Sequence, residues 1–229
     1  TETNGFQLLK DSTLVLQNGT IAIAENANNI KRIIQNYADL TLENMTIEAK
    51  NQVDGEMLMA NLKNAGFELC DDAALADVAI VNTCGFIDSA KQESIDEILE
   101  LATLKKEGRI KKIVVTGCLA ERYREEILKE LPEVDGVFGI GANADIAACI
   151  ESAMNDFTES FPEKSKMPLC GERELSTPSY LAYIKIAEGC DNKCTYCAIP
   201  MIRGGYRSRT MESIEEEARG LVENGAKEL

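Results

Sequence analysis

The stretch "ADVAIVNTC" at residues 76–84, with the similar "KKIVVTGC" at residues 111–118, decides the fold. Each is a short apolar run that ends in a cysteine, and amphipathic segments lie before, between and after them. Alternation of this kind is typical of α/β domains with a parallel sheet. Carboxyl ends of parallel strands share one sheet edge, where ligands bind, so we expect Cys84 and Cys118 to lie together there. Two unrelated buried thiols are the alternative.

The segments around these strands carry helix signals. A helix that ends at Gly66 precedes the first strand, and a helix that buries Ile98 and Leu99 and ends at Gly108 joins the two strands. The "GIG" at residues 139–141 lacks the third glycine of a dinucleotide fingerprint. It is therefore predicted to be a turn at the sheet edge.

A second group of cysteines occurs in "GCDNKCTYC" at residues 189–197. Cys190, Cys194 and Cys197 have the spacing C-x3-C-x2-C, and the chain contains no histidine. Structural zinc usually takes four Cys or His ligands, whereas three thiolates suit a [4Fe–4S] cluster with one open iron. The spacing therefore favours a cluster, with zinc or a redox-active pair as alternatives.

Composition limits the class of protein. The 229 residues are 45% hydrophobic and 5% aromatic, which is typical of a globular chain. No apolar run reaches membrane-spanning length and no secretory signal begins the sequence, so we expect a cytoplasmic protein without membrane contact. A net charge of −15 opposes strong nucleic-acid binding, because that affinity comes from Lys and Arg. The uneven spread of eight cysteines argues against a disulfide-stapled secreted domain.

Texture along the chain predicts four regions. Residues 1–47 are β-rich with Asn-Gly turns, which suggests β-solenoid-like rungs or a fusion artefact. Residues 48–154 form the α/β domain, and the proline-containing residues 155–178 form a linker. Residues 179–229 contain a strand, the cysteine loop and a helix, and we expect them to open a larger, truncated domain.

Together these motifs resemble the radical S-adenosylmethionine (SAM) methylthiotransferases. "GCDNKCTYC" resembles their cluster loop, and "VNTCGFIDSAKQES" (81–94) with "VTGCLAERY" (115–123) resembles their amino-terminal domain. Residues 183–209 are similar to the branch that methylthiolates an aspartate of a small-subunit ribosomal protein, more than to the branch that modifies transfer-RNA adenosine. The resemblance covers about residues 50 to 229.

The resemblance implies a flavodoxin-like parallel-sheet domain followed by the first βα unit of a radical SAM, TIM-like barrel. It implies that Cys190, Cys194 and Cys197 ligate a [4Fe–4S] cluster whose open iron binds SAM. Tyr196 would lie beside the adenine, or else shield the cluster from water. The implied partners are a ribosomal protein substrate and an electron donor such as flavodoxin or ferredoxin.

The family's amino-terminal domain also binds a second [4Fe–4S] cluster through three cysteines. Cys84 and Cys118 match two of them, but Glu48 stands at the position of the first. A carboxylate replaces a thiolate poorly on an iron–sulfur cluster, so the second cluster is doubtful here. Cys70 is the nearest spare thiol, and residues 42–48 are a candidate replacement for the family's first strand.

The predicted function is that of an enzyme that transfers a methylthio group to an aspartate of a small-subunit ribosomal protein. We expect this chain to be an incomplete, inactive fragment of such an enzyme. Alternatives are a transfer-RNA adenosine methylthiotransferase and a non-catalytic iron–sulfur or β-solenoid interaction module. Arg203, Arg207 and Arg209 are expected to be solvated surface charges, with substrate contact as the alternative.

Overall fold

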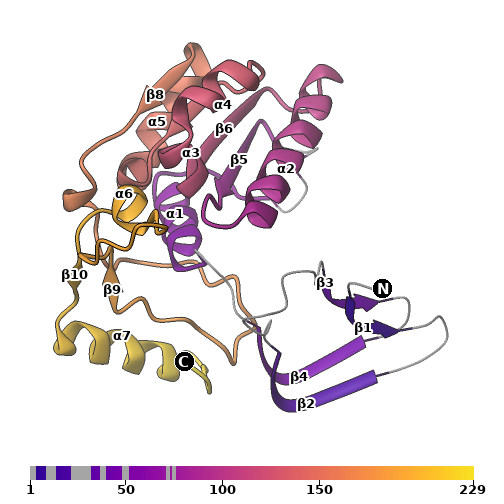
Figure 1. Cartoon of the computed structure of the whole chain (residues 1–229), viewed down its shortest axis with the longest axis vertical. Helices are drawn as coiled ribbons and strands as arrows, with labels where there is room; N and C mark the ends of the chain where they lie inside the picture. The colour runs from indigo at the N-terminus through magenta and orange to yellow at the C-terminus, as the bar shows by residue number, and fades with distance from the viewer. Residues whose placement is uncertain are drawn as a thin grey trace. The chain divides into compact units, whose positions relative to one another are not determined.

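The computed structural model describes the backbone of residues 4–8, 14–21, 32–36 and 40–47, and residues 52–70, 73 and 76–229 with their side chains. The chain divides into two compact units, Thr1–Lys50 and Asn51–Leu229 (Figure 1). No helix in these described ranges combines the length and the apolar character that crossing a membrane requires.

The first unit contains two pairs of parallel strands. Strand β1 (Asn4–Leu8) pairs with β3 (Arg32–Asn36), and β2 (Leu14–Ile21) pairs with β4 (Leu40–Ile47). Parallel pairing of each strand with the strand two elements later is typical of stacked solenoid rungs, and that interpretation stays a prediction. The proposed replacement strand at residues 42–48 falls largely on β4, which pairs with β2, while Glu48 lies outside the described residues.

The second unit is built on a four-stranded parallel sheet, which confirms the predicted α/β class. Its strands lie in sequence order: β5 (Val78–Thr83), β6 (Lys112–Gly117), β7 (Gly136–Phe138) and β8 (Thr158–Ser160). The fourth strand lies in residues 155–178, which the sequence had indicated as linker. Residues 139–141 lead from β7 into a short 3-10 helix at the sheet edge, as expected for a turn.

Helices cover both faces of this sheet (Figure 1). On β6, Ile113 and Val115 pack against one set of helices and Val114 against the other. The first set comprises α2 (Asp88–Lys106), α3 (Cys118–Arg122) and α4 (Arg124–Glu130); the second comprises α1 (Gln52–Asn64), η2 (Ile140–Asp145) and α5 (Ile146–Asn155). Strands buried on both faces read as continuous apolar runs, which is why these segments are recognisable.

The two predicted helix ends are confirmed, and so is one of the two predicted core positions of α2. Gly66 and Gly108 follow α1 and α2 with φ of 89° and 75°, the left-handed conformation that ends helices at glycine. Ile98 is buried, but the prediction for Leu99 is wrong, since its exposed fraction is 47%. Leu99 is one position from Ile98, which rotates it about 100° away from the face that meets the sheet.

The rest of the second unit is mostly irregular. It contains η3 (Lys164–Lys166), β9 (Ala187–Glu188), α6 (Ile199–Arg203), β10 (Arg207–Ser208) and α7 (Met211–Glu223). The strand expected from residue 179 is reduced to β9 and one parallel bridge between Leu181 and Glu228. A strand is defined by its ladder, and these residues have little ladder to join among the described residues.

Truncation of the central strand should destabilise the second unit. Ile113 is fully buried between the sheet and α2, so Ile113→Ala should lower the free energy of unfolding by about 3 kcal/mol. Urea denaturation followed by circular dichroism measures this. Leu99→Ala is the matched control and should cost less than about 1 kcal/mol, because Leu99 is half exposed. Equal losses in the two variants would contradict this assignment of the core.

Candidate functional site

Cys84 and Cys118 lie at adjacent strand ends, as predicted. Thr83, the last residue of β5, pairs in register with Gly117, the last residue of β6, and each is followed directly by a cysteine. A Cβ on Gly117, which has φ of 97°, would lie 2.4 Å from the Thr83 carbonyl oxygen. A Cβ on Gly85 would lie 2.7 Å from the Cys118 carbonyl oxygen. Glycine at both positions therefore permits the close approach of the two cysteine-bearing corners.

Hydroxyl groups hold these corners in place. The amide of Cys84 donates to Ser94 Oγ at 3.2 Å, and Ser94 in turn donates to the Ala90 carbonyl within α2. Thr83 Oγ1 donates to the Thr116 carbonyl and accepts from the Ala120 amide. The sequence interpretation missed Thr83 and Ser94; Thr83, immediately before Cys84, could have been found from that position.

The cysteine loop of residues 189–206 is closed at its base by the antiparallel pair β9 and β10. Gly189 has φ of 71°, and a Cβ there would lie 2.2 Å from the Gly205 carbonyl oxygen. The Cys190 amide donates to the Gly204 carbonyl at 3.1 Å. The glycines on both sides of the loop thus let its two ends meet, and the three cysteines lie between them.

The loop thiols are accessible in the structure. Cys194 is exposed, Cys190 and Cys197 are half-buried, and Tyr196 has an exposed fraction of 91%. Within residues 52–70, 73 and 76–229, no three Cys, Asp or Glu side chains are grouped closely enough to hold a metal ion. The donor set nevertheless fits a [4Fe–4S] cluster, because three soft thiols come from one short closed loop and binding orders such ligands.

The two cysteine regions are in contact through α6. Cys118, with an exposed fraction of 5%, packs in one buried cluster with Ala198 and Ile202. Ala198 directly follows Cys197, the last cysteine of the loop. The carboxyl edge of the sheet is thus packed against the end of the cysteine loop.

Arg203, the last residue of α6, makes the polar contacts of this junction. Its Nη1 donates to Asp54 in the first turn of α1 and to Glu188 Oε2 of β9, the latter at 3.2 Å. Its Nη2 donates to Cys118 Sγ at 3.2 Å. Lys185 Nζ pairs with Asp54 at 2.6 Å and with Glu188 at 3.2 Å. The cations of Arg203 and Lys185 therefore share the carboxylates of Asp54 and Glu188 beside the end of α6.

The ion pairs of this junction shift the pKa values of Arg203 and Asp54 against the effect of burial. Burial opposes the charged form of Arg203, but attraction to Asp54, then to Cys118 and Glu188, outweighs it and raises the pKa of Arg203. Burial likewise opposes ionisation of Asp54, yet Arg203 and Lys185 lower the pKa of Asp54 below its ordinary value of 3.8. Both groups are therefore charged at neutral pH.

The expectation of solvated arginines is wrong for Arg203 and Arg209, whose exposed fractions are 7% and 8%. Arg209 pairs with Glu217 of α7 and donates to the Lys185 carbonyl at 3.0 Å. Arg207 donates to three carbonyls of residues 164, 165 and 167 around η3. These arginines bind carboxylates and backbone carbonyls of the same chain, and their spacing in the sequence does not reveal those partners.

A second acidic residue of α1 extends this junction. Glu56 is 1% exposed and accepts from the amide and hydroxyl of Ser176, each at 3.1 Å. It also pairs with Arg173 at 3.4 Å. Helix α1 is thus attached through two buried carboxylates to residues that follow the sheet.

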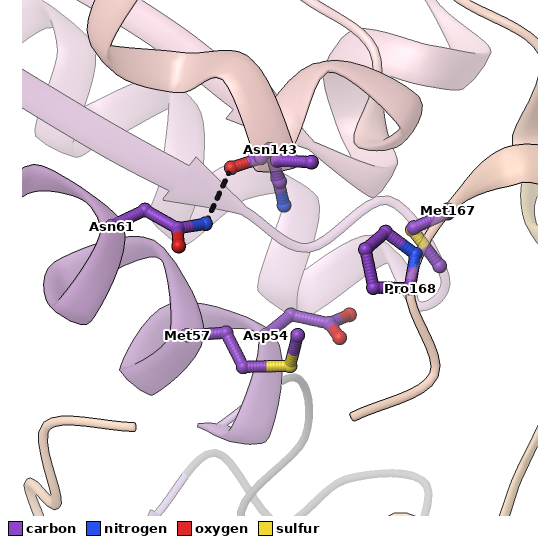
Figure 2. A pocket seen from close by; sticks show the side chains of 7 residues that line it. Asp54, Met57, Asn61, Asn143, Met167 and Pro168 are labelled. Carbon is purple, nitrogen blue, oxygen red and sulfur yellow. Dashed lines mark hydrogen bonds between the residues drawn. The ribbon is translucent and has the colours of Figure 1, made fainter. Parts of the chain in front are cut away.

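A small pocket lies beside Asp54, between α1, η2 and the segment after η3 (Figure 2). Asn61 Nδ2 donates to the Asn143 carbonyl at 3.1 Å across it. The lining residues are Asp54, Met57, Asn61, Asn143, Ala144, Met167 and Pro168. The Asp54 carboxylate is already paired with Lys185 and Arg203, so the pocket belongs to the junction described above.

The second cluster does not fit the described residues. Cys84 and Cys118 supply two thiols. Cys118 is buried beneath α6, and its sulfur accepts a hydrogen bond from Arg203. Glu48 lies outside the described residues, and Cys70 is exposed in the segment after α1. The ligand roles of Cys84 and Cys118 therefore stay predictions.

Comparison with protein families gives two matches. Residues 49–139 match the model described as "Uncharacterized protein family UPF0004", and residues 184–229 match the Radical SAM superfamily. The first match covers the region from α1 to the end of β7, and the second covers the cysteine loop and α7.

Curated relatives match both regions together. The chain is 50% identical to the ribosomal protein uS12 methylthiotransferase RimO of Clostridioides difficile over 189 residues, which is 79% of this chain and 41% of that protein. It is 49% identical to the protein of the same name from Desulforamulus reducens, with the same coverage. The chain thus spans about two fifths of the length of these relatives.

Neutralisation of Asp54 should weaken the junction in a pH-dependent way. Asp54→Asn leaves the buried Arg203 and the half-buried Lys185 short of a carboxylate, so it should lower the free energy of unfolding at pH 7 by about 3 kcal/mol. Since the pKa of Asp54 is lowered on folding, this stabilisation is complete above the unfolded pKa and disappears as pH falls through the folded value. The deficit of the variant should therefore shrink below pH 3.8.

Urea denaturation at a series of pH values measures the deficit. Asp77→Asn is the matched control, because Asp77 pairs with Lys111 at the exposed surface, and its cost should stay below about 1 kcal/mol at every pH. A deficit for Asp54→Asn that is independent of pH would show that the carboxylate charge does not stabilise the junction.

Proposed function

Because the chain belongs to the radical SAM methylthiotransferase family, we propose that it is part of an enzyme that transfers a methylthio group to an aspartate of ribosomal protein uS12. The observation that carries the proposal is the closed loop with Cys190, Cys194 and Cys197, in a chain about half identical to proteins named for this activity. The chain spans 41% of those relatives, so the activity is proposed for the whole protein.

The loop residues would hold the cluster. Cys190, Cys194 and Cys197 would each supply one thiolate, which leaves one iron open for the amino and carboxylate groups of SAM. A bound cluster of this kind supplies the electron that cleaves the carbon–sulfur bond of SAM. Asn192 Nδ2, which lies 3.5 Å from Cys190 Sγ, is placed to hydrogen-bond that sulfur.

Other residues of the chain would bind and shield. Tyr196 lies between two proposed ligands in the sequence, and its exposed ring would cover an adenine ring or the cluster. The glycines at the base of the loop hold its backbone ends together without any side chain between them. Arg203 and Arg209, being buried in ion pairs, are proposed to support the fold of the loop and not to contact a substrate.

The proposed partners follow from this chemistry. A one-electron donor such as flavodoxin or ferredoxin would reduce the cluster, and a ribosomal protein would be the substrate, which places the enzyme in the cytoplasm. A basic ribosomal protein suits a chain with a net charge of −15, since opposite charge speeds association.

Two alternatives are separable. A transfer-RNA adenosine methylthiotransferase is less favoured, because the acidic charge opposes RNA binding and the relatives are named for a ribosomal protein. A non-catalytic iron–sulfur or β-solenoid module would bind a cluster without responding to SAM. Mass spectrometry of uS12 and of transfer RNA from cells that lack the gene tests the substrate: loss of the methylthio group from uS12 alone is expected.

Replacement of the loop cysteines tests the cofactor. After anaerobic reconstitution the chain should bind about four irons, one cubane cluster. Changing Cys190, Cys194 and Cys197 together to Ala should remove most of this iron and its visible absorbance, because the three thiolates are the proposed ligands. Iron and sulfide analysis with absorbance spectra measures the loss.

The matched control changes three cysteines outside the loop and the sheet edge, namely Cys70, Cys149 and Cys170, to Ala. This variant should keep its iron. An unchanged cluster in the loop variant, or equal losses in both variants, would refute the loop as the cluster site.

A further inference from the structure

We propose that Arg203 is a positioning residue that fixes Cys118 against the end of the cysteine loop. The inference deepens the proposed function, because it assigns to one side chain the spatial relation between the two cysteine regions. It rests on the contacts of a single buried guanidinium with Asp54, Glu188 and Cys118.

Arg203 contacts three separate elements at once. Asp54 belongs to α1, Glu188 to β9 at the start of the loop, and Cys118 to the first position of α3. Arg203 itself ends α6, which begins two residues after Cys197. A planar guanidinium with several fixed donors can serve three acceptors in different directions, which a single ammonium group cannot do with the same geometry.

The position of the guanidinium is set by the two carboxylates. Transferring a cation out of water costs several kcal/mol unless oppositely charged groups surround it. Asp54 and Glu188 are themselves at most one tenth exposed, so each needs Arg203 or Lys185 as a counter-charge. The head group is therefore held from the Asp54 and Glu188 side, which leaves Nη2 directed at Cys118 Sγ.

The apolar side of the same helix completes the arrangement. Ala198 and Ile202 of this segment pack on Cys118, so the thiol has apolar atoms on one side and the guanidinium on another. Displacing Arg203 would free the end of α6 and at the same time remove the hydrogen bond from Arg203 to Cys118. The distance between Cys118 and position 198 should therefore depend on Arg203.

A disulfide reports this distance without any metal or substrate. In a background where Cys84, Cys190, Cys194 and Cys197 are Ala, the change Ala198→Cys places one thiol beside Cys118. Mild oxidation with diamide removes two electrons and two protons from the pair and is followed by peptide mapping. Because this background cannot load a cluster at the loop, the outcome does not depend on the proposed enzyme activity.

With Arg203 present, the new disulfide should form in most molecules. Arg203→Gln should slow its formation about tenfold, since disulfides require Cβ atoms within a narrow range of distance. Arg203→Lys should also slow it, because one amine cannot bridge the carboxylates and the thiol. Arg207→Gln is the matched control and should leave the rate unchanged, because the guanidinium of Arg207 donates to backbone carbonyls around η3.

A double variant distinguishes positioning of Cys118 by Arg203 from a general effect of Arg203 on stability. Asp54→Asn should slow the disulfide as Arg203→Gln does, and the double variant should be no slower than either one, since both act on the same contact. Urea titrations of each variant give the folded fraction to which the rates are normalised. Should Arg203→Gln fail to fold, Arg203→Lys and Glu188→Gln decide the question by the same rate. Normalised rates equal to that of the protein with Arg203 would overturn the proposal.

Discussion

The junction between the sheet domain and the cysteine loop depends on one buried cation. Arg203 is removed from water between Asp54 and Glu188, and its remaining donor meets the sulfur of Cys118. An arginine in this place is stable only if the carboxylates stay where they are, so α1 and β9 are fixed relative to α6. The position of the cysteine loop follows from that constraint.

The two central strands of the sheet were predictable because their apolar runs are recognisable in the sequence. Residues 78–81 and 113–115 are apolar on both faces, and parallel pairing then placed Cys84 and Cys118 at one edge. The short strand β8 was not predictable, because Thr158–Ser160 is polar and lies at the sheet margin, where one neighbour suffices. The strand expected at residue 179 failed for the opposite reason: its apolar pattern is clear, but its ladder partners are few.

The sequence offers candidate ligands for the site, whose role stays a prediction, but it did not reveal the surroundings of these ligands. The spacing of Cys190, Cys194 and Cys197 points to a cluster because all three thiols lie in one short loop and can be recognised from the sequence alone. Burial of Arg203 depends on Asp54, 149 residues earlier in the sequence, and no local pattern encodes such a pairing. Arg209 pairs with Glu217, eight residues later in α7, and that pairing appears only once the loop before α7 is placed. Ser94 accepts from the Cys84 amide and donates to the Ala90 carbonyl, and this role was missed although both partners are near it in sequence.

The cysteine loop is proposed to hold a cluster with one iron open to SAM. Electron paramagnetic resonance of the reconstituted, dithionite-reduced chain, recorded with and without SAM, tests it most directly, because a ligand on the open iron changes the electronic environment of the cluster. SAM should change the signal, and the change should disappear when Cys190, Cys194 and Cys197 are replaced by Ala. An intact cluster whose spectrum is the same with and without SAM would contradict the assignment.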